Sequence, residues 1–267
     1  MRTGPSIGIL GGMGPHAGFD LAVKVTNQTH ASTDHDHVPV VVLSAPHTIP
    51  DRSTFLLDRT QPSPIPALVN LAQQLERAGA TAMGIPCNTA HATPILEPLI
   101  ETIAAQGGQI QVVDMIQETV RHIQQTHPAV QRVGVLSTTA VYRLKLYADA
   151  LDAAGMTTVV PDETLQETIV NPTIFNATWG LKAQAHPVTA TARGYLLDAI
   201  AALKAQGAEV IILGCTELPL AVPEPIIDDL PMVDPTVVLA RALIRETFPD
   251  KLRPLPATRS TSPLPDV

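Results

Sequence analysis

The chain holds two cysteines, Cys87 and Cys215, and they occupy equivalent positions in two similar stretches of sequence. In each stretch a Gly-Ala pair precedes a short apolar run, and the cysteine stands eight residues after the glycine, which is Gly79 or Gly207. Two thiols that reach one ligand from opposite sides can invert a carbon centre, because one removes a proton from one face and the other returns a proton to the opposite face. The matched pair therefore predicts proton transfer at carbon.

Other roles for two cysteines have to be weighed against this one. Free cysteines are most often small buried hydrophobic residues. A redox pair is expected to show the Cys-x-x-Cys spacing, which this sequence does not have. Two cysteines in 267 residues are also too few for a disulfide scaffold. The duplicated surroundings of the two residues favour the chemical interpretation.

Parallel β-strands that alternate with helices are the elements predicted to position these cysteines. Short apolar runs typical of buried strands occur at 7–10, 39–43, 81–85, 112–113, 133–136, 158–160 and 210–213. Between Pro66 and Gly79, Leu68, Leu71 and Leu75 recur with helical spacing. Continuous apolar strands separated by helices indicate parallel sheets.

The order of strand, helices, strand and cysteine occurs twice in the chain, which suggests an internal repeat. We therefore predict an α/β fold with two similar parallel-sheet domains related by a pseudo-twofold axis. Ligands of open α/β sheets bind beyond the carboxyl ends of the strands, so the active site is expected in the cleft between the domains. The predicted limits are 1–114 and 115–235, with a helix around 236–248 packing back on the first domain and a disordered tail over 252–267.

Composition and charge exclude several classes of protein. The chain is 45% hydrophobic, which is enough for a substantial core, and its formal net charge is −8. An acidic chain with no basic cluster is a poor candidate for binding nucleic acid or an anionic membrane. No apolar stretch approaches the roughly 18 residues that a membrane span needs, and we expect a protein of the reducing cytoplasm.

Three further segments have residue types that are associated with binding sites. The glycine-rich segment 8–15 departs from the nucleotide-binding patterns, so we interpret it as a tight turn that lets the backbone approach a ligand. Segment 34–37, Asp-His-Asp-His, has no third ligand of clear spacing, so we predict a polar loop and no metal site. Arg52 follows a strand-like run, where it is either a surface residue or a bidentate partner for a substrate carboxylate.

The chain resembles the aspartate/glutamate racemase family, and within it the aspartate racemase branch. The matching segments extend to about Phe248 and are Ile7-Gly8-Ile9-Leu10-Gly11-Gly12-Met13-Gly14-Pro15, Asp36-His37-Val38-Pro39, Ile49-Pro50-Asp51-Arg52, Pro86-Cys87-Asn88-Thr89-Ala90-His91, Gly214-Cys215-Thr216-Glu217 and Val233-Asp234-Pro235-Thr236. A glutamate racemase is expected to have Asp-Ser where this chain has Gly11-Gly12, which favours the aspartate branch.

This resemblance implies two α/β domains and a racemisation that needs no cofactor. It assigns the two bases to Cys87 and Cys215. The substrate contacts that we predict with it are Met13, Arg52, Ser53, Asn88, Thr89, Ala90, Thr139, Lys182 and Thr216. Members of the family often dimerise, so a homodimer that binds a small dicarboxylic amino acid is expected. Two segments depart from the family pattern, Ser137-Thr138-Thr139-Ala140 and the residues after Lys182, and both departures can reshape the substrate side-chain pocket.

Together these observations predict an amino-acid racemase that acts on aspartate by thiolate and thiol proton transfer at the α-carbon. Alternatives within the enzymes are a racemase of glutamate or another amino acid, and a cysteine-dependent isomerase or decarboxylase that acts on a hydantoin or a malonate derivative. A non-catalytic protein that kept the ligand cleft is the alternative outside the enzymes. The retained pair of cysteines argues against that last interpretation.

Overall fold

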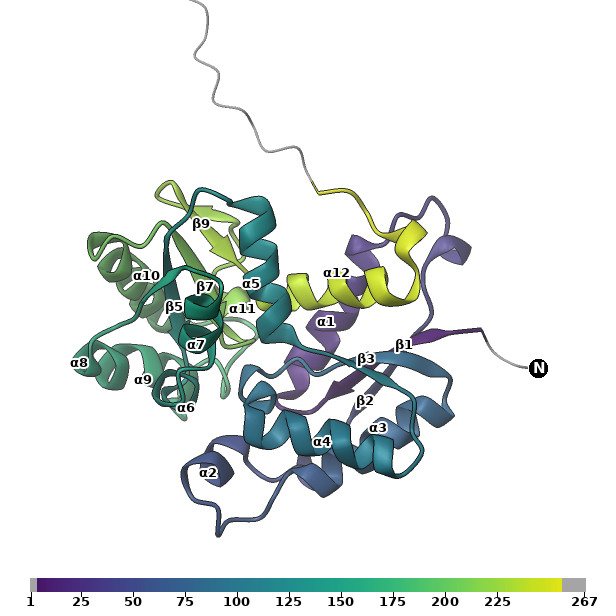
Figure 1. The fold of residues 1–267 in the computed structure, drawn as a ribbon. Helices are drawn as coiled ribbons and strands as arrows, with labels where there is room; N and C mark the ends of the chain where they lie inside the picture. The colour runs from purple at the N-terminus through teal and green to yellow at the C-terminus, as the bar shows by residue number, and fades with distance from the viewer. Residues whose placement is uncertain (1–3, 256–267) are drawn as a thin grey trace, which may run out of the picture.

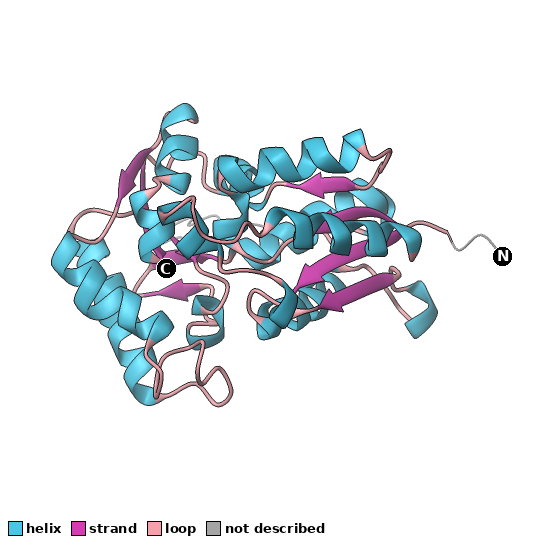
Figure 2. Cartoon of the chain, turned by 90° about the horizontal axis from the view of Figure 1, so that it is seen from below, coloured by secondary structure: helices cyan, strands magenta, loops and turns pink. Residues whose placement is uncertain are grey.

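A computed structural model describes residues 4–255, so most of the predicted tail, 256–267, lies outside the described residues. The described chain forms two α/β halves, each built around its own sheet (Figure 1). Helices lie against both sheets, as Figure 2 shows with the strands in magenta. The predicted fold class, two parallel-sheet α/β units, is confirmed.

The first sheet has the strand order β2-β1-β3-β4, and its strands are all parallel. Its members are β1 (Ser6–Gly11), β2 (Val40–Ser44), β3 (Ala80–Gly84) and β4 (Gln111–Val113). Every residue of β1 is buried, because helices cover both faces of this central strand.

The second sheet has the order β6-β5-β7-β9-β8. Its members are β5 (Arg132–Ser137), β6 (Thr157–Val159), β7 (Val210–Gly214), β8 (Ile226–Ile227) and β9 (Leu230–Val233). The pairs from β6 to β9 are parallel, and only β8 runs antiparallel, in a short hairpin with β9. The first four strands repeat the order of the first sheet, so β3 and β7 occupy equivalent positions.

All the predicted strands are present, and their ends differ by one residue at most. The hairpin of β8 and β9 was not predicted. Its strands are short, Pro231 interrupts the apolar pattern, and Asp228 and Asp229 form the turn with positive φ angles. Because a segment with these residues looks like a loop when only the sequence is read, the two strands were missed.

The helices that cover the sheets are long, and the helices within the connecting loops are short. The long ones cover the sheets and are α1 (Pro15–Gln28), α3 (Ile65–Arg77), α4 (Thr93–Ala105), α5 (Met115–Thr126), α7 (Leu146–Ala153), α10 (Ala190–Ala205) and α12 (Pro235–Thr247). The short ones lie in the connections and are α2 (Arg52–Leu57), α6 (Thr139–Arg143), α8 (Glu163–Leu165), α9 (Asn171–Phe175) and α11 (Leu218–Ala221). Single turns complete the chain at Asp34–Asp36, Pro46–Thr48, Asn88–His91, Gln166–Val170 and Pro249–Lys251.

The C-terminal helix α12 belongs by its packing to the first sheet, although it follows the second sheet in sequence. Leu239 and Leu243 are fully buried in one cluster with Ile7 and Ile9 of β1. The helix lies alongside α1 and also contacts α5 (Figure 1). Burial of these apolar side chains fixes the helix there. The exact domain limits at 114 and 235 remain a prediction.

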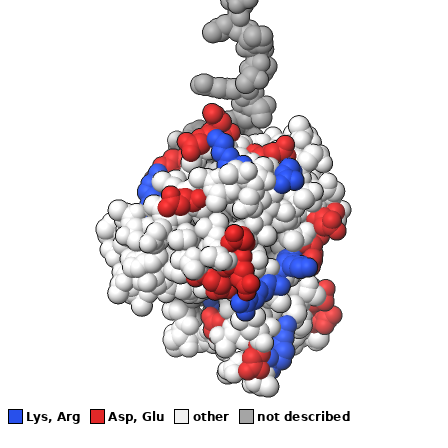
Figure 3. All heavy atoms as spheres, turned by 90° about the vertical axis from the view of Figure 1, so that its left-hand side faces the viewer, with Lys and Arg blue, Asp and Glu red and all other residues white. Residues whose placement is uncertain are grey.

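The surface mixes charges of both signs. On the face drawn in Figure 3, basic and acidic side chains lie next to one another in small groups. Among residues 4–255, none of the helices combines the length and the apolar character that a membrane crossing requires.

Candidate active site

The two cysteines line the same small cavity, which lies between the two sheets and has a volume of about 30 Å³. Cys87 lies just after the end of β3, and Cys215 directly follows β7. Each cysteine is 6% exposed. The equivalent positions of β3 and β7 in their sheets therefore bring one thiol from each half to a common space.

The same local turn positions each cysteine. The carbonyl of Cys87 accepts a hydrogen bond from the Ala90 N–H at 3.0 Å, and the carbonyl of Cys215 accepts one from the Leu218 N–H at 2.9 Å. The chain thus turns sharply at the end of each strand, and the residue at the turn projects toward the ligand side. The helices that follow, Asn88–His91 and α11, have only four residues each.

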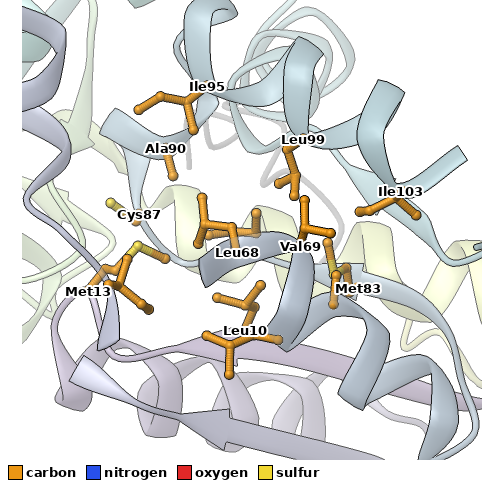
Figure 4. Packing of buried hydrophobic residues seen from close by; sticks show 14 of the residues in the cluster. Leu10, Met13, Leu68, Val69, Met83, Cys87, Ala90, Ile95, Leu99 and Ile103 are labelled. Carbon is orange, nitrogen blue, oxygen red and sulfur yellow. The ribbon is translucent and has the colours of Figure 1, made fainter. Parts of the chain in front are cut away.

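Cys87 lies at the edge of a large apolar cluster of the first half. Figure 4 shows Cys87 and Met13 at one end of this cluster and Ile103 at the other. Ala90 lies close to Cys87 in the same view, fully buried. The cluster supports the thiol from behind and leaves its other side toward the cavity.

Cys215 has a polar partner, the carboxylate of Glu217. The Cys215 thiol donates a hydrogen bond to Glu217 Oε2 at 3.1 Å, and the Thr216 hydroxyl donates to the same oxygen at 3.3 Å. Burial, followed by the negative charge of Glu217, raises the pKa of Cys215 well above its usual range. The negative charge of Glu217 and the burial of the sulfur therefore both disfavour the thiolate of Cys215 in the free protein.

Lys182 forms an ion pair with Glu217 on the other side of the carboxylate. Its Nζ donates to Glu217 Oε1 at 2.7 Å. Burial alone raises the pKa of Glu217, but the charge and hydrogen bond of Lys182 outweigh burial and hold that pKa below its usual value. Burial likewise opposes the charge of Lys182, yet the negative charge of Glu217 raises the pKa of Lys182. Both groups are therefore ionised at neutral pH.

Two buried donors at the cavity have no hydrogen-bond acceptor within the described part of the chain: Nε of Arg52 and Nδ2 of Asn88. Arg52 donates from Nη1 to the Pro50 carbonyl at 3.2 Å, which orients its guanidinium. Asn88 accepts at Oδ1 from the hydroxyl of Tyr147 at 2.6 Å, which leaves Nδ2 as its free end. A carboxylate ligand can satisfy such donors.

The structure brings together most of the predicted site residues. Those that line the cavity with the two cysteines are Met13, Arg52, Ser53, Asn88, Thr89, Lys182 and Thr216. Ala90 does not line it, because its side chain packs into the apolar cluster. Thr139 does not line it either, because its hydroxyl donates to Glu167 at 3.4 Å. The neighbouring Thr138 lines the cavity instead, and its hydroxyl caps α6 by accepting from the Val141 N–H.

Sequence reasoning gave no role to several residues that line the cavity: Asp51, Thr138, Phe175, Gly214 and Glu217. The sequence did contain a signal for Glu217. It is an acidic residue two positions after Cys215, and it belongs to the matched segment Gly214-Cys215-Thr216-Glu217. Phe175 had no such signal, since α9 contains none of the segments that match the family. Lys182 Nζ lies 5.8 Å from the centre of its ring.

Within residues 4–255, no group of three histidine, cysteine or acidic side chains is arranged to hold a metal ion. The acidic segment 34–37 forms a local turn, in which Asp36 accepts hydrogen bonds from the N–H groups of Ser32 and Thr33. The charged side chains that line the cavity are those of Asp51, Arg52, Lys182 and Glu217.

The fold and the site define an α/β protein of two similar halves, with a ligand cavity between them that carries one thiol from each half. The sequence profile of the Asp/Glu/hydantoin racemase family matches residues 10–243. The chain belongs to this family, which confirms the resemblance seen in the sequence, and it is an isomerase of the amino-acid racemase type.

Individual relatives agree with this assignment. The broad specificity amino-acid racemase RacX of Bacillus subtilis is 29% identical over 248 residues, which cover 89% of this chain and 96% of the relative. The aspartate racemase of Picrophilus torridus has a TM-score of 0.72 and 27% identity, covering 91% of this chain and 94% of its own. The glutamate racemase of Francisella tularensis shares the fold, with a TM-score of 0.60 and 17% identity, over 94% of this chain and 83% of its own.

Proposed function

We propose that the protein interconverts L- and D-aspartate without a cofactor, by two-base proton transfer between Cys87 and Cys215. The observation that carries this proposal is the pair of thiols on one cavity, each at the end of an equivalent strand. One thiolate removes the α-proton of one enantiomer, and the opposite thiol protonates the planar intermediate from the other face. After this step the first cysteine holds the proton and the second is the thiolate, which is the state that the reverse reaction requires. Another turnover in the same direction begins only after both thiols exchange protons with solvent.

Without an electron sink, the cavity has to stabilise the negative charge that moves onto the α-carboxylate as the proton leaves. Fixed hydrogen-bond donors do this best in a site from which water is excluded. We assign this role to Asn88 Nδ2, a buried donor that has no acceptor among the described residues. The hydroxyl of Thr216 joins it when its hydrogen bond to Glu217 Oε2 is exchanged for one to the substrate. Arg52 and Lys182 then hold the side-chain carboxylate of aspartate.

A broader substrate range is the second candidate, and one contact favours it. Lys182 is already paired with Glu217, so Arg52 is the one cation at the cavity whose side chain has no carboxylate partner among the described residues. A site with one available cation binds one carboxylate strongly, and other amino acids can then compete with aspartate. The similarity to a broad specificity racemase supports the same interpretation.

Incubation of a panel of amino acids with the purified protein in D2O tests both candidates. Exchange at Cα together with loss of optical activity identifies a racemase and ranks its substrates, whereas tight binding without exchange identifies a binding protein. Release of CO2 from malonate derivatives without any amino-acid exchange would instead identify a decarboxylase.

Variants of the two cysteines test the mechanism. Cys87→Ala and Cys215→Ala should each abolish racemisation while the unfolding transition is kept, because each removes one of the two bases. Full racemisation in both directions by either variant would contradict the two-base mechanism. We further propose a cytoplasmic homodimer, which light scattering tests for the oligomeric state.

A further inference from the structure

Glu217 is a buried carboxylate on the wall of the cavity, with 3% of its surface exposed. The other carboxylate on this wall, Asp51, has a structural role, because its Oδ1 accepts from the N–H and the hydroxyl of Thr54 at 2.7 and 2.9 Å and so caps α2. Among residues 4–255, the side chain of Glu217 caps no helix, and its hydrogen-bond partners Lys182, Cys215 and Thr216 all line the cavity. A negative charge kept in such a place needs a cation.

The position of Glu217 relative to Cys215 restricts which part of a substrate it can meet. Its Oε2 lies 3.1 Å from the sulfur of Cys215. For proton transfer, that sulfur has to approach the α-carbon to about 3–3.5 Å. The nitrogen of an amino acid is bonded to this same carbon. A carboxylate in contact with the sulfur can therefore reach a group that is bonded to the α-carbon. Of those groups, only the ammonium carries a positive charge.

The backbone of the first half comes close to the carboxylate. A side-chain carbon added at Gly14 would lie 3.3 Å from Glu217 Oε1, so a larger residue at this position would crowd the carboxylate. Segment 11–14 reads Gly-Gly-Met-Gly and contributes no charge of its own. The negative charge that can bind a cation near Gly14 therefore comes from Glu217, which belongs to the second half.

The charges around Glu217 fit a zwitterion. In the free protein, Lys182 and Glu217 neutralise one another at 2.7 Å. An amino acid carries both signs, so its ammonium can bind Glu217 while the side-chain carboxylate of aspartate binds Lys182 and Arg52. A dicarboxylate without an amino group offers nothing to Glu217 and brings a like charge close to it, which is unfavourable.

We propose that Glu217 binds the α-ammonium group of the substrate and is the residue that selects amino acids over acids without an amino group. This inference rests on the proposed racemase function and adds a specificity residue to it. It also couples binding to chemistry, because an ammonium beside Glu217 offsets the negative charge that disfavours the Cys215 thiolate. The thiol then becomes easier to ionise when substrate is present.

The test compares two ligands that differ only in the amino group, aspartate and succinate, or the corresponding pair for whichever amino acid of the panel exchanges fastest. Their dissociation constants are measured by calorimetry on the wild-type protein and on Glu217→Gln. We expect aspartate to bind at least about tenfold more weakly to the variant, since a charge-assisted hydrogen bond is lost. Succinate should bind to the variant as tightly as to the wild type, or more tightly. The ratio of the two dissociation constants, which measures the preference for the amino group, should therefore fall.

Asp51→Asn is the matched control, because it removes the other carboxylate of the same cavity wall. It should lower the stability of α2 but keep the preference for aspartate over succinate. Glu217→Asp keeps the charge on a shorter side chain, and it should fall between wild type and Glu217→Gln. It also serves as the test variant if the glutamine variant does not fold.

The outcomes separate this inference from the proposed function. An unchanged aspartate-to-succinate preference in Glu217→Gln or Glu217→Asp, with wild-type racemisation intact, would overturn the role of Glu217 alone. An absence of exchange for every amino acid in the wild-type protein would overturn the racemase function itself, and this inference with it.

Discussion

The hydroxyl of Tyr147 donates a hydrogen bond to Asn88 Oδ1 at 2.6 Å, and this bond joins the two halves of the protein behind the cavity. Tyr147 lies on α7 in the second half and is 1% exposed, whereas Asn88 follows Cys87 in the first half. Because the bond engages the amide oxygen, the amide nitrogen is the end that remains for a ligand. Tyr147 is thus a positioning residue for Asn88.

Replacement of Tyr147 by Phe should reduce kcat/KM for the fastest substrate by roughly 5- to 10-fold, the effect of about 1 kcal/mol of lost orientation. The loss should appear in kcat, since the amide donor acts on charge that develops during the reaction. Steady-state kinetics checks this. The exposed Tyr195 on α10 provides the control, and Tyr195→Phe should leave both parameters unchanged. A wild-type kcat for Tyr147→Phe would contradict the positioning role.

Replacement of Arg52 by Met should raise KM by roughly 10- to 100-fold, because a charged hydrogen bond to a carboxylate contributes about 1.5–3 kcal/mol. Arg52→Lys should recover only part of this, since an ammonium cannot present the two-pronged guanidinium contact. Arg59, which stacks on Phe55 at 4.7 Å and is exposed, is the matched control. If Arg52→Met kept the wild-type KM, the carboxylate site would have to lie elsewhere.

Iodoacetamide should modify Cys215 slowly at neutral pH in the free protein, because its raised pKa leaves little thiolate. Glu217→Gln removes a negative charge that raises this pKa, so alkylation should become faster. Lys182→Met removes a positive charge that lowers it, so alkylation should become slower still. Mass spectrometry of the peptide that contains Cys215, in a Cys87→Ser background, follows both rates. Equal rates in the two variants would show that this ion pair does not control the thiol.

The ion pair of Lys182 and Glu217 should also contribute to stability in a pH-dependent way. The pKa of Glu217 is lowered in the folded protein, so its contribution is present above the unfolded value of 4.5 and is lost as the pH falls through the folded pKa. The difference in unfolding free energy between wild type and Glu217→Gln should therefore be constant near neutral pH and shrink below about pH 4.5. Urea denaturation between pH 7 and pH 3 measures it.

Glu101→Gln on the exposed side of α4 is the control for this last experiment, because its side chain faces solvent and makes no hydrogen bond within residues 4–255. Its unfolding free energy should follow that of wild type at each pH. A difference for Glu217→Gln that grows toward acid pH would reverse the assigned direction of the pKa shift.

The sequence by itself determined the strands β1 to β7, the fold class and the two cysteines as a pair. These depend on local patterns, since an apolar run or a Gly-Ala-to-cysteine spacing is set by neighbours along the chain. The matched positions of Cys87 and Cys215 were visible for this reason, and so was membership of the racemase family.

Only the tertiary structure decided how the side chains around the thiols are paired. Lys182 was predicted to contact the substrate, and the fold also pairs it with Glu217 at 2.7 Å, a residue 35 positions away in sequence. Tyr147 reaches Asn88 across 59 residues, and Thr138 faces the cavity in place of its neighbour Thr139. Such contacts depend on how two sheets and their connections pack together, and a short-range burial pattern carries no information about that arrangement.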